Sequence, residues 1–581
     1  MMKWTRTTSF KITLTTLVLL VVSCTRDKSL KDSTINFPLS GQISTLDPAN
    51  SYDSVSASVV YQGYEQLFEY HYLQRPYRLI PLLAKSMPKV ENNGKKYIIQ
   101  IKEGIQYHDD ASFKGKKRFV KAQDFITQIK RLAFKSTNSN GWWLFDGRIK
   151  GINKFREVVG NDFEKFKSTN IEGITAPNDH TLIIELSEPY PQMVNALAMS
   201  FTSPLPLESV EYYKHNLNSV MIGTGAYKLD QWTRGSKVIL SKFENYHKAF
   251  YPGNGDRVSH ARKLVADAGK KIPFVDKVIF HINKEAQTRW LQFLSGNLDF
   301  LRVPKDNFST VINESGKLKN EFKDKNIHVE VFSTLTFWWI GFNMKDAILG
   351  QNLNLRKAIA HAIDVRKYIQ TFTNNVGLKA NSIFPPGIPG YDPTVDVPFE
   401  YNIEKAKEYL AKAGYPNGKG LPTLTYDTRG SSTTQRQRAE FFKNQLLKIG
   451  VNLKTQLNTF PSYLKKAREG KLQLWLDGWS LDYPDAENVL QLLTTKNIAP
   501  GPNASSYSNP EFDKMFEEVK KMANTNEKFL LMKRMENIVQ REMPWALLLY
   551  ERDYYAISNR LKNFRYSDLM SNKVKYLRLG K

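Results

Sequence analysis

The chain has 581 residues, of which 41% are hydrophobic, and its formal net charge is +26. This length and apolar content are enough to build large hydrophobic cores in roughly three or four domains. The basic residues are dispersed, and the densest cluster, residues 114–118, is short. Nucleic-acid binding needs clustered Lys and Arg, so we expect no nucleic-acid partner. The dispersed charge favours solubility or attraction to an anionic membrane surface.

The first residues have the layout of an export signal. A basic segment precedes an apolar stretch, residues 12–22, that is too short to span a bilayer. Cys24, the single cysteine, directly follows Ser23, and this arrangement resembles the lipobox of bacterial lipoproteins, in which the cysteine carries lipid. We therefore expect a signal peptide over 1–23, lipidation of Cys24 and a tether over 24–33. The alternative is an ordinary secretory signal or an uncut anchor, with the cysteine incidental.

Short apolar runs rich in β-branched and aromatic residues predict strands in the first half of the chain. These runs are residues 97–101, 181–186, 238–240 and 278–282. Residues 122–133 predict a helix, since Phe125, Ile129 and Leu132 fall on one face.

The second half alternates helices and strands more regularly. Helices are predicted over residues 355–369, 402–413, 433–449, 462–469, 510–519 and 527–541, and strands over 422–426, 451–457 and 472–476. This alternation predicts right-handed crossovers and a mostly parallel, twisted sheet. The fold class is therefore α/β.

The loop that follows the strand at 472–476 is the best candidate for a binding site. Residues 477–485 hold one glycine, two aromatic residues and three carboxylates. In open α/β sheets, ligands bind outside the carboxyl ends of the strands. We therefore expect the ligand to meet this loop.

Several short motifs occur in order along the chain. They are Leu46-Asp47-Pro48-Ala49, ITAPNDHTLIIELSEPYP at residues 174–191, Gly223-Thr224-Gly225-Ala226-Tyr227, Leu355-Arg356-Lys357-Ala358, and Gly478-Trp479 followed by Asp482-Tyr483-Pro484. Each motif is weak alone, but their order and spacing are jointly specific. With them, nearly the whole chain after the leader resembles the family 5 extracellular solute-binding proteins of ABC transporters, the oligopeptide- and dipeptide-binding group.

The resemblance implies a two-lobed clamp of the periplasmic-binding-protein type (type II, large cluster), with mixed, mostly parallel sheets. Lobe I would consist of residues 34–74, 191–332 and 556–581, around an inserted domain at 75–190. Lobe II would cover 333–555. Parallel connecting segments would form the hinge, and closure of the lobes would bury the ligand.

The resemblance also implies how a peptide is held. Its ammonium group needs a carboxylate once it leaves water, and Asp482 occupies the family position for this contact. Helix capping is the alternative role of this residue. Trp479 would form a pocket wall, and Phe460 lies near another aromatic position of the family. The peptide backbone would pair with Gly478 and with residues 52–54 as an added strand.

The predicted peptide-binding residues are Tyr52, Asp53, Ser54, Trp142, Phe460, Gly478, Trp479, Asp482 and Tyr483. Trp142 and Trp143 are adjacent, so only one of them is expected to face the cleft from a strand. Some family members hold the ligand carboxylate with an Arg two positions before the glycine, where this chain has Leu476. Arg429 and Arg468 are possible substitutes.

Enzyme signatures are absent from the sequence. It contains no His-Glu-x-x-His, Gly-x-Ser-x-Gly or Walker motif. His108-Asp109-Asp110 is interpreted as a turn rather than a metal site. The carboxylates of Asp482, Asp485 and Glu487 resemble a glycosidase pair in type, but we do not interpret them as catalytic. We expect no catalysis, no cofactor and no metal.

Three functions stay open. The first is capture of peptides by a monomer, lipid-anchored on the periplasmic or extracellular face of the cell envelope, that delivers them to an ABC import permease. The second is capture of a non-peptide solute, such as a nickel chelate, haem or a sugar, on the same fold. The third is a basic surface lipoprotein that acts in adhesion or polyanion contact.

Overall fold

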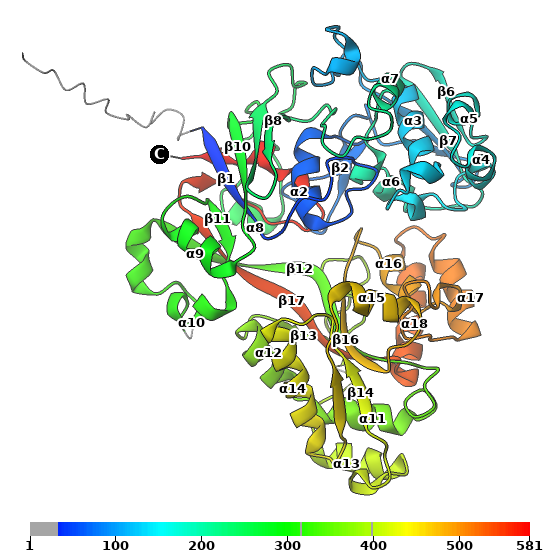
Figure 1. The fold of residues 1–581 in the computed structure, drawn as a ribbon, viewed down its shortest axis with the longest axis vertical. Helices are drawn as coiled ribbons and strands as arrows, with labels where there is room; N and C mark the ends of the chain where they lie inside the picture. The colour runs from blue at the N-terminus through cyan, green and yellow to red at the C-terminus, as the bar shows by residue number, and fades with distance from the viewer. Residues whose placement is uncertain (1–32, 314–315, 397–398, 581) are drawn as a thin grey trace, which may run out of the picture.

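The computed structural model describes residues 33–313, 316–396 and 399–580 and has two lobes joined by two long strands (Figure 1). The predicted signal peptide, Cys24 and all but the last residue of the predicted tether lie outside the described residues. Within these ranges, no helix is both long enough and apolar enough to cross a membrane.

The first lobe is built on a four-stranded sheet in the order β1-β10-β9-β8. Its strands are β1 (Thr34–Leu39), β8 (Tyr227–Thr233), β9 (Lys237–Lys242) and β10 (Lys277–Ile282). β1 and β10 run parallel, whereas the other two pairs are antiparallel. Helix α2 (Ser54–Gly63) packs against β8 and shares the core of this lobe.

The last residues of the chain return to the first lobe. The 3₁₀ helix η10 (Ser571–Tyr576) packs against α2, and β18 (Leu561–Lys562) pairs with β19 (Arg578–Leu579). Glu69 lies in β2 (Phe68–Tyr70), which pairs with β3 (Leu79–Pro81). This carboxylate accepts hydrogen bonds from Asn572 (2.6 Å), Lys575 (2.9 Å) and Tyr576 (3.0 Å). The two ends of the described chain therefore share one buried polar cluster.

An antiparallel subdomain extends the first lobe. Its sheet has the order β4-β5-β7-β6, formed by β4 (Lys89–Glu91), β5 (Lys96–Gln100), β6 (Ile174–Asn178) and β7 (Thr181–Glu185). Its helices are α3 (Ala122–Ala133), α4 (Ile152–Val159), α5 (Phe163–Ser168), α6 (Met193–Ala196) and α7 (Leu207–Tyr212). Its hydrophobic core continues to Ile222, beyond the predicted boundary at residue 190.

The second lobe is built on a larger sheet in the order β11-β17-β12-β16-β14-β15, with β13 paired to β17. Its strands are β11 (Phe300–Arg302), β12 (Ile327–Phe342), β13 (Leu378–Lys379), β14 (Leu424–Asp427), β15 (Leu453–Gln456), β16 (Leu474–Ser480) and β17 (Trp545–Ser558). Its helices are α11 (Leu353–Ala362), α12 (Val365–Thr373), α13 (Ile403–Lys412), α14 (Thr433–Leu447), α15 (Phe460–Arg468), α16 (Glu487–Leu490), α17 (Pro510–Val519) and α18 (Asn526–Glu542).

Two long strands connect the lobes. β12 pairs with β17 in antiparallel fashion, from Ile327 with Ser558 to Gly341 with Trp545. The prediction of parallel connecting segments is therefore wrong in direction, because the chain enters the second lobe along one strand and leaves it along the other. β11 pairs with the other edge of β17. The helices α8 (Arg257–Ala261), α9 (Ala286–Leu294) and α10 (Phe308–Val311) lie in the first lobe and at its junction with the strands (Figure 1).

The mixed α/β class is confirmed, but the sheets are not mostly parallel. The alternating strands and helices over 420–480 do form the predicted parallel unit, since β14 runs parallel to both β15 and β16. Elsewhere most ladders are antiparallel, because β12 and β17 reverse direction at the hinge and the subdomain strands are joined as antiparallel pairs.

Two predicted elements differ in extent. The predicted helix over 355–369 is two helices, because Asp364 accepts a hydrogen bond from the backbone N–H of Lys367 and caps α12. The predicted strand at 472–476 is longer, since pairing with β12 extends β16 to Ser480. Gly478 and Trp479 therefore lie in a strand and not in a loop.

Candidate functional site

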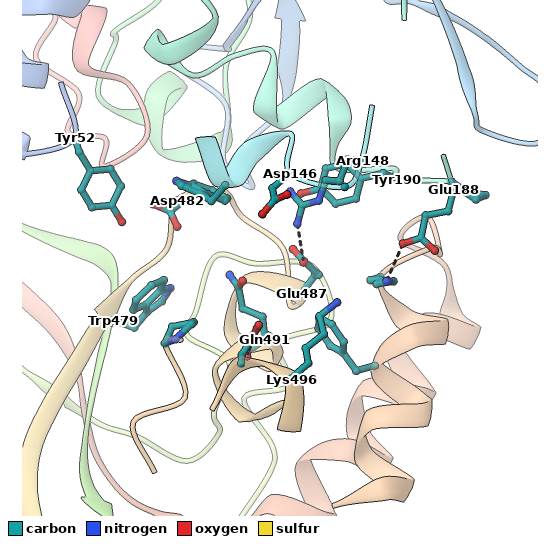
Figure 2. Close-up of a pocket in the computed structure, with 17 residues that line it drawn as sticks. Tyr52, Asp146, Arg148, Glu188, Tyr190, Trp479, Asp482, Glu487, Gln491 and Lys496 are labelled. Atoms are coloured by element: carbon teal, nitrogen blue, oxygen red, sulfur yellow. Dashed lines mark hydrogen bonds and ion pairs between the residues drawn. The ribbon is translucent and has the colours of Figure 1, made fainter. Parts of the chain in front are cut away.

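A cavity of about 550 Å³ lies between the antiparallel subdomain and the second lobe (Figure 2). One wall comes from Tyr52, Trp143 and residues 146–148 and 188–190. The opposite wall comes from Trp479 and Asp482 at the end of β16 and from residues on and after α16. Ligand bound here would contact both lobes at once.

Asp482 is a half-buried carboxylate in the wall of this cavity. Its Oδ2 accepts a hydrogen bond from Nδ2 of Asn488, and its backbone N–H donates to Oδ1 of the same residue, both at 3.1 Å. Burial raises the pKa of Asp482 to about 6, and the negative charge of Glu487 adds to this increase, whereas the bond from Asn488 opposes it. Among the described residues, no Lys, Arg or His forms an ion pair with Asp482. A cation from a ligand would satisfy this group.

Two aromatic side chains flank Asp482. The indole N–H of Trp479 donates to Oδ1 of Asn488 at 2.8 Å, which fixes its ring in the cavity wall. Tyr52, 53% exposed just before α2, reaches in from the first lobe and stacks on Phe201 with ring centroids 6.2 Å apart. The charge of Asp482 raises the pKa of the Tyr52 hydroxyl, so these two groups interact across the cleft (Figure 2).

One edge of β16 remains available beside this site. Its other edge pairs with β12, and its ladder with β14 ends at Trp475. From residue 476 onward, no strand in the described part of the chain pairs with the β14 side. Main-chain groups on an open strand edge can pair with an extended backbone. A Cβ atom on Gly478 would lie 2.6 Å from the ring of Trp338, so close packing by this indole requires glycine.

Six of the nine predicted residues lie outside the cavity wall: Gly478 on β16, Trp142, and four others. Tyr483 is buried, and its hydroxyl donates to Glu487 and lies 3.5 Å from the Tyr190 hydroxyl. Asp53 caps α2 by accepting from the backbone N–H of Ser56 at 2.8 Å. Ser54 is exposed on the first turn of that helix. Phe460 is 47% exposed at the start of α15.

The structure places Trp143, and not Trp142, in the cavity wall. Both belong to a 3₁₀ helix (Trp142–Leu144) instead of a strand, so their directions do not alternate as predicted. The Trp142 ring packs under the guanidinium group of Arg156 at 4.7 Å. The expectation that Trp142 faces the cleft is corrected accordingly.

Charged residues far apart in the sequence link the lobes along the cavity. Arg148 lies over the ring of Tyr190 at 4.1 Å, with its Nη2 3.9 Å from Glu487 across the cleft. Glu188 forms ion pairs with Lys520 at 2.9 Å and Lys521 at 3.1 Å. Sequence reasoning missed Arg148 and Lys520 because nothing in their local patterns marks them. It also missed Glu188, although this residue lies within the motif at 174–191.

Two possible substitutes for a carboxylate-binding Arg were predicted, Arg429 and Arg468. Arg468 is exposed at the end of α15 and does not line the cavity, which leaves Arg429. Leu476 is 2% exposed in the core and cannot reach a ligand. Arg429 follows β14, forms an ion pair with Asp477 at 3.3 Å and lies over the rings of Trp338 and Phe460 at 5.3 Å. It therefore lies beside the open edge of β16.

The carboxylates near Asp482 are already engaged. Asp485 is buried in an ion pair with Lys528 at 2.7 Å, and Glu487 faces Arg148 and Tyr483. This leaves no free carboxylate pair of the glycosidase type in the cavity. His108 is buried with Nε2 2.9 Å from the carbonyl oxygen of Gly225, and no described group of His, Cys, Asp and Glu is arranged to hold a metal.

Comparison with known proteins agrees with this geometry. The profile described as "Bacterial extracellular solute-binding proteins, family 5 Middle" matches residues 78–501. The oligopeptide-binding protein OppA of Bacillus subtilis is 26% identical over 541 residues, covering 91% of this chain and 90% of that protein. Heme-binding protein A of Haemophilus influenzae is 24% identical over 498 residues, covering 83% and 81%.

A solved structure shares the two-lobed architecture. The periplasmic binding protein DppA from Helicobacter pylori, in complex with the peptide STSA, is 25% identical, and the comparison gives a TM-score of 0.72 over 94% of this chain and 98% of that one. The profile spans well over half of the sequence, including the antiparallel subdomain and much of the second lobe. This chain therefore belongs to the bacterial extracellular solute-binding proteins of family 5.

Proposed function

We propose that this protein captures peptides with a free N-terminus in the cavity at Asp482 and delivers them to an ABC import permease. The observation that carries the proposal is the Asp482 carboxylate, which lies in an interlobe cavity with no cationic partner among the described residues. A buried charge without a partner is costly, and the ammonium group of a peptide supplies the missing charge.

The surroundings of Asp482 suit a peptide backbone of any sequence. The open edge of β16 offers main-chain donors and acceptors from residue 476 onward. Pairing with these groups ignores side-chain identity, as in other cases of strand addition. Trp479 and Tyr52 supply apolar surface against the first side chains, and Arg429 is the nearest candidate for a peptide carboxylate.

Relatives include binders of different solutes, so a second candidate is a non-peptide solute on the same fold. The names of similar proteins mention oligopeptides in one case and haem in another. The free Asp482 carboxylate favours a ligand with a positive end, and the peptide in the similar DppA complex has the same class of chemistry. We therefore place peptides first.

Isothermal titration calorimetry with paired peptides tests the proposal. A tetrapeptide with a free amino group should bind, and its N-acetylated form should bind at least about 100-fold more weakly, since loss of a buried charge pair costs 3–5 kcal/mol. Asp482→Asn should remove this discrimination. Equal affinity for both peptides would contradict the proposal, and native mass spectrometry of the purified protein would then identify the alternative solute.

The proposal includes a lipid anchor on the outer face of the membrane and a role limited to binding, without catalysis. The basis for the lipid anchor is Cys24, which follows the apolar stretch of the predicted signal peptide. Two acyl chains are enough to tether a soluble body. Metabolic labelling with a radioactive fatty acid should mark the wild type and leave Cys24→Ser unlabelled. Label on the Cys24→Ser protein would rule out this anchor.

A further inference from the structure

A cavity of about 450 Å³ lies between α18 and the loop that follows β13. We call it the α18 cavity. One wall is a single face of the helix, formed by Asn526, Phe529, Leu530, Lys533 and Glu536. Side chains three and four residues apart lie on the same face of a helix, so this spacing aligns them. The other wall is formed by loop residues Phe384, Gly390, Tyr391, Asp392 and Val395.

The loop is held against α18 by close packing at Gly390. A Cβ atom on this residue would lie 2.6 Å from the Phe529 ring and 2.8 Å from the Met532 side chain. Tyr391 is fixed as well, since its hydroxyl donates to Oδ1 of Asn381 at 3.3 Å. The walls are therefore preformed, which reduces the ordering cost of binding a ligand.

Glu536 is a buried carboxylate in this cavity, with only 4% of the residue exposed. Its Oε1 accepts a hydrogen bond of 3.0 Å from the backbone N–H of Ile383. Burial raises the pKa of Glu536, and hydrogen bonds from Ser382 and Ile383 only partly oppose this. Among the residues that the structure describes, no Lys, Arg or His forms an ion pair with it. A buried carboxylate is costly unless a cation accompanies it.

The balance of charge in the α18 cavity favours a cationic ligand. Lys533 is paired with a different acid, since its Nζ lies 3.8 Å from Oδ2 of Asp392. Of the described wall residues, Glu536 and Asp392 are acidic and Lys533 is basic, which leaves one net negative charge. The whole chain carries +26, so this cavity runs against the charge of the molecule. An anion would be repelled by the free carboxylate.

Three aromatic rings form the apolar part of the cavity. Phe384 is buried, and Tyr391 and Phe529 are half-buried. The face of an aromatic ring is electron-rich and attracts an organic cation. Leu530, 65% exposed, adds apolar surface that solvent reaches. A metal ion does not fit, because no described group of three His, Cys, Asp or Glu residues is placed to hold one.

The α18 cavity is distinct from the cavity at Asp482. No described residue lines both, and every wall residue of the α18 cavity belongs to the second lobe. The helices α16 and α17 contribute to the cavity at Asp482 and share a hydrophobic core with α18. Within that core, Met532 and Met535 of α18 are 1% and 0% exposed. A peptide held at Asp482 is separated from the α18 cavity by this packed core, which favours a separate molecule as the occupant.

We propose that the α18 cavity binds a small organic cation, with its ammonium group beside Glu536 and its apolar part against the three rings. The proposal goes beyond peptide capture, because it uses no residue of the cavity at Asp482. The ligand joins α18 to the loop after β13, so its binding requires no closure of the lobes. A ligand that binds only the folded protein also raises the unfolding temperature.

Calorimetric titration of the full chain with choline tests the site. Its neutral isostere 3,3-dimethylbutan-1-ol has a similar shape without the charge and should bind at least about tenfold more weakly. Glu536→Gln should weaken choline binding at least about tenfold, and Phe529→Leu about threefold. Glu527→Gln is the matched control, because Glu527 is exposed on the same helix and does not line the cavity.

Peptides distinguish the two binding sites. Asp482 is another carboxylate that choline can approach, so the titration is repeated with Asp482→Asn. This variant should keep its choline binding and lose its preference for free amino termini, whereas Glu536→Gln should do the reverse. Saturating choline should leave the peptide affinity of the wild type unchanged. A failure of the peptide proposal is therefore distinguishable from a failure of this one.

Four results would overturn the proposal. They are no heat of binding with choline up to about 10 mM, equal affinity for choline and its neutral isostere, equal choline binding by the Glu527 and Glu536 variants, and competition between peptide and choline in Asp482→Asn. The last would make the peptide itself the source of the ammonium group. Circular dichroism checks the fold of each variant. If Glu536→Gln is unfolded, Phe529→Leu and the comparison of choline with its isostere decide the outcome.

Discussion

Asp482 and Asn488 hold each other through two reciprocal hydrogen bonds of 3.1 Å, one to the carboxylate and one from the backbone N–H. Asn488 is fully buried, and its Oδ1 also accepts the indole N–H of Trp479 at 2.8 Å. One amide therefore fixes both the carboxylate and the aromatic wall before a ligand arrives. Such preorganisation reduces the ordering cost of binding.

Peptide affinity should fall as the solution becomes acidic. In the empty protein the pKa of Asp482 is about 6, and an ammonium ligand lowers it by favouring the charged form. Binding below pH 6 therefore first requires loss of a proton, and the affinity should drop roughly tenfold per pH unit there. Calorimetry between pH 5 and 8 measures this profile. Asp482→Asn should give weak binding that is flat with pH, and a flat wild-type profile would contradict the assignment.

The same carboxylate should make the empty protein less stable at neutral pH. The pKa of Asp482 is about 6 in the folded protein and about 3.9 in the unfolded chain, because burial disfavours the charged carboxylate. The stability associated with the neutral carboxyl is fully present below about pH 3.9 and is lost as the pH rises through 6, where the folded protein must bury the charge. Asp482→Asn should increase the free energy of unfolding at pH 7.5 by roughly 1–3 kcal/mol and leave it nearly unchanged near pH 4. Urea denaturation at the two pH values measures this difference. An equal increase in the free energy of unfolding at both pH values would show that the charge of Asp482 is not its cause.

Asn488→Ala should weaken peptide binding without removing the charge of Asp482. The variant loses the acceptor for Trp479 and the donor to Asp482, which costs about 1–3 kcal/mol for unsatisfied buried groups. We expect about tenfold weaker binding and an altered tryptophan emission spectrum. Gln491→Ala is the control, because Gln491 lines the cavity and has no bond to the side chain of Asp482 or Trp479. The same loss in both variants would show that Asn488 has no special positioning role.

The ion pairs of Glu188 should stabilise closed lobes. Glu188 of the antiparallel subdomain meets Lys520 and Lys521 of the second lobe. Partly exposed pairs contribute only about 0–1 kcal/mol each, so Glu188→Gln should shift small-angle X-ray scattering modestly toward open lobes. Glu517→Gln is the matched control, because it also pairs with Lys520 but from within the same lobe. An equal shift in both variants would exclude an interlobe role.

Arg131 should be critical for stability because of its bond to Asp47. Arg131 and Asp47 are 1% and 2% exposed, and two guanidinium nitrogens lie 2.6 and 3.1 Å from the carboxylate. Arg131→Met leaves an unpaired buried carboxylate and should cost about 3–5 kcal/mol. The double variant with Asp47→Asn should recover part of this loss. Urea denaturation measures both, and additive losses would contradict the pairing.

Local patterns predicted local structure well. The helix at 122–133 has the predicted bounds because its apolar stripe is regular, and the parallel unit over 420–480 follows from alternating segments of suitable length. The Gly223 motif has a packing reason, since a Cβ there would lie 1.8 Å from the carbonyl oxygen of Gly63. Asp482, Trp479 and Tyr52 line one cavity, and these were predicted from the resemblance.

Contacts between distant segments could not be predicted in the same way. Arg148 meets Glu487 only because the subdomain folds over the second lobe, and no local pattern encodes that approach. The antiparallel pairing of β12 with β17 joins strands more than 200 residues apart. The choice of Trp143 over Trp142 depended on a 3₁₀ turn that the predicted strand alternation did not include.

The hydrogen bonds from η10 to Glu69 also bear on how the protein is made. Glu69 is surrounded by donors from Asn572, Lys575 and Tyr576, which the ribosome adds 503, 506 and 507 residues after Glu69. Until they emerge, the N-terminal strands would have to bury this carboxylate with nothing to neutralise it. Native folding of the first lobe is therefore delayed until the residues of η10 have been synthesised.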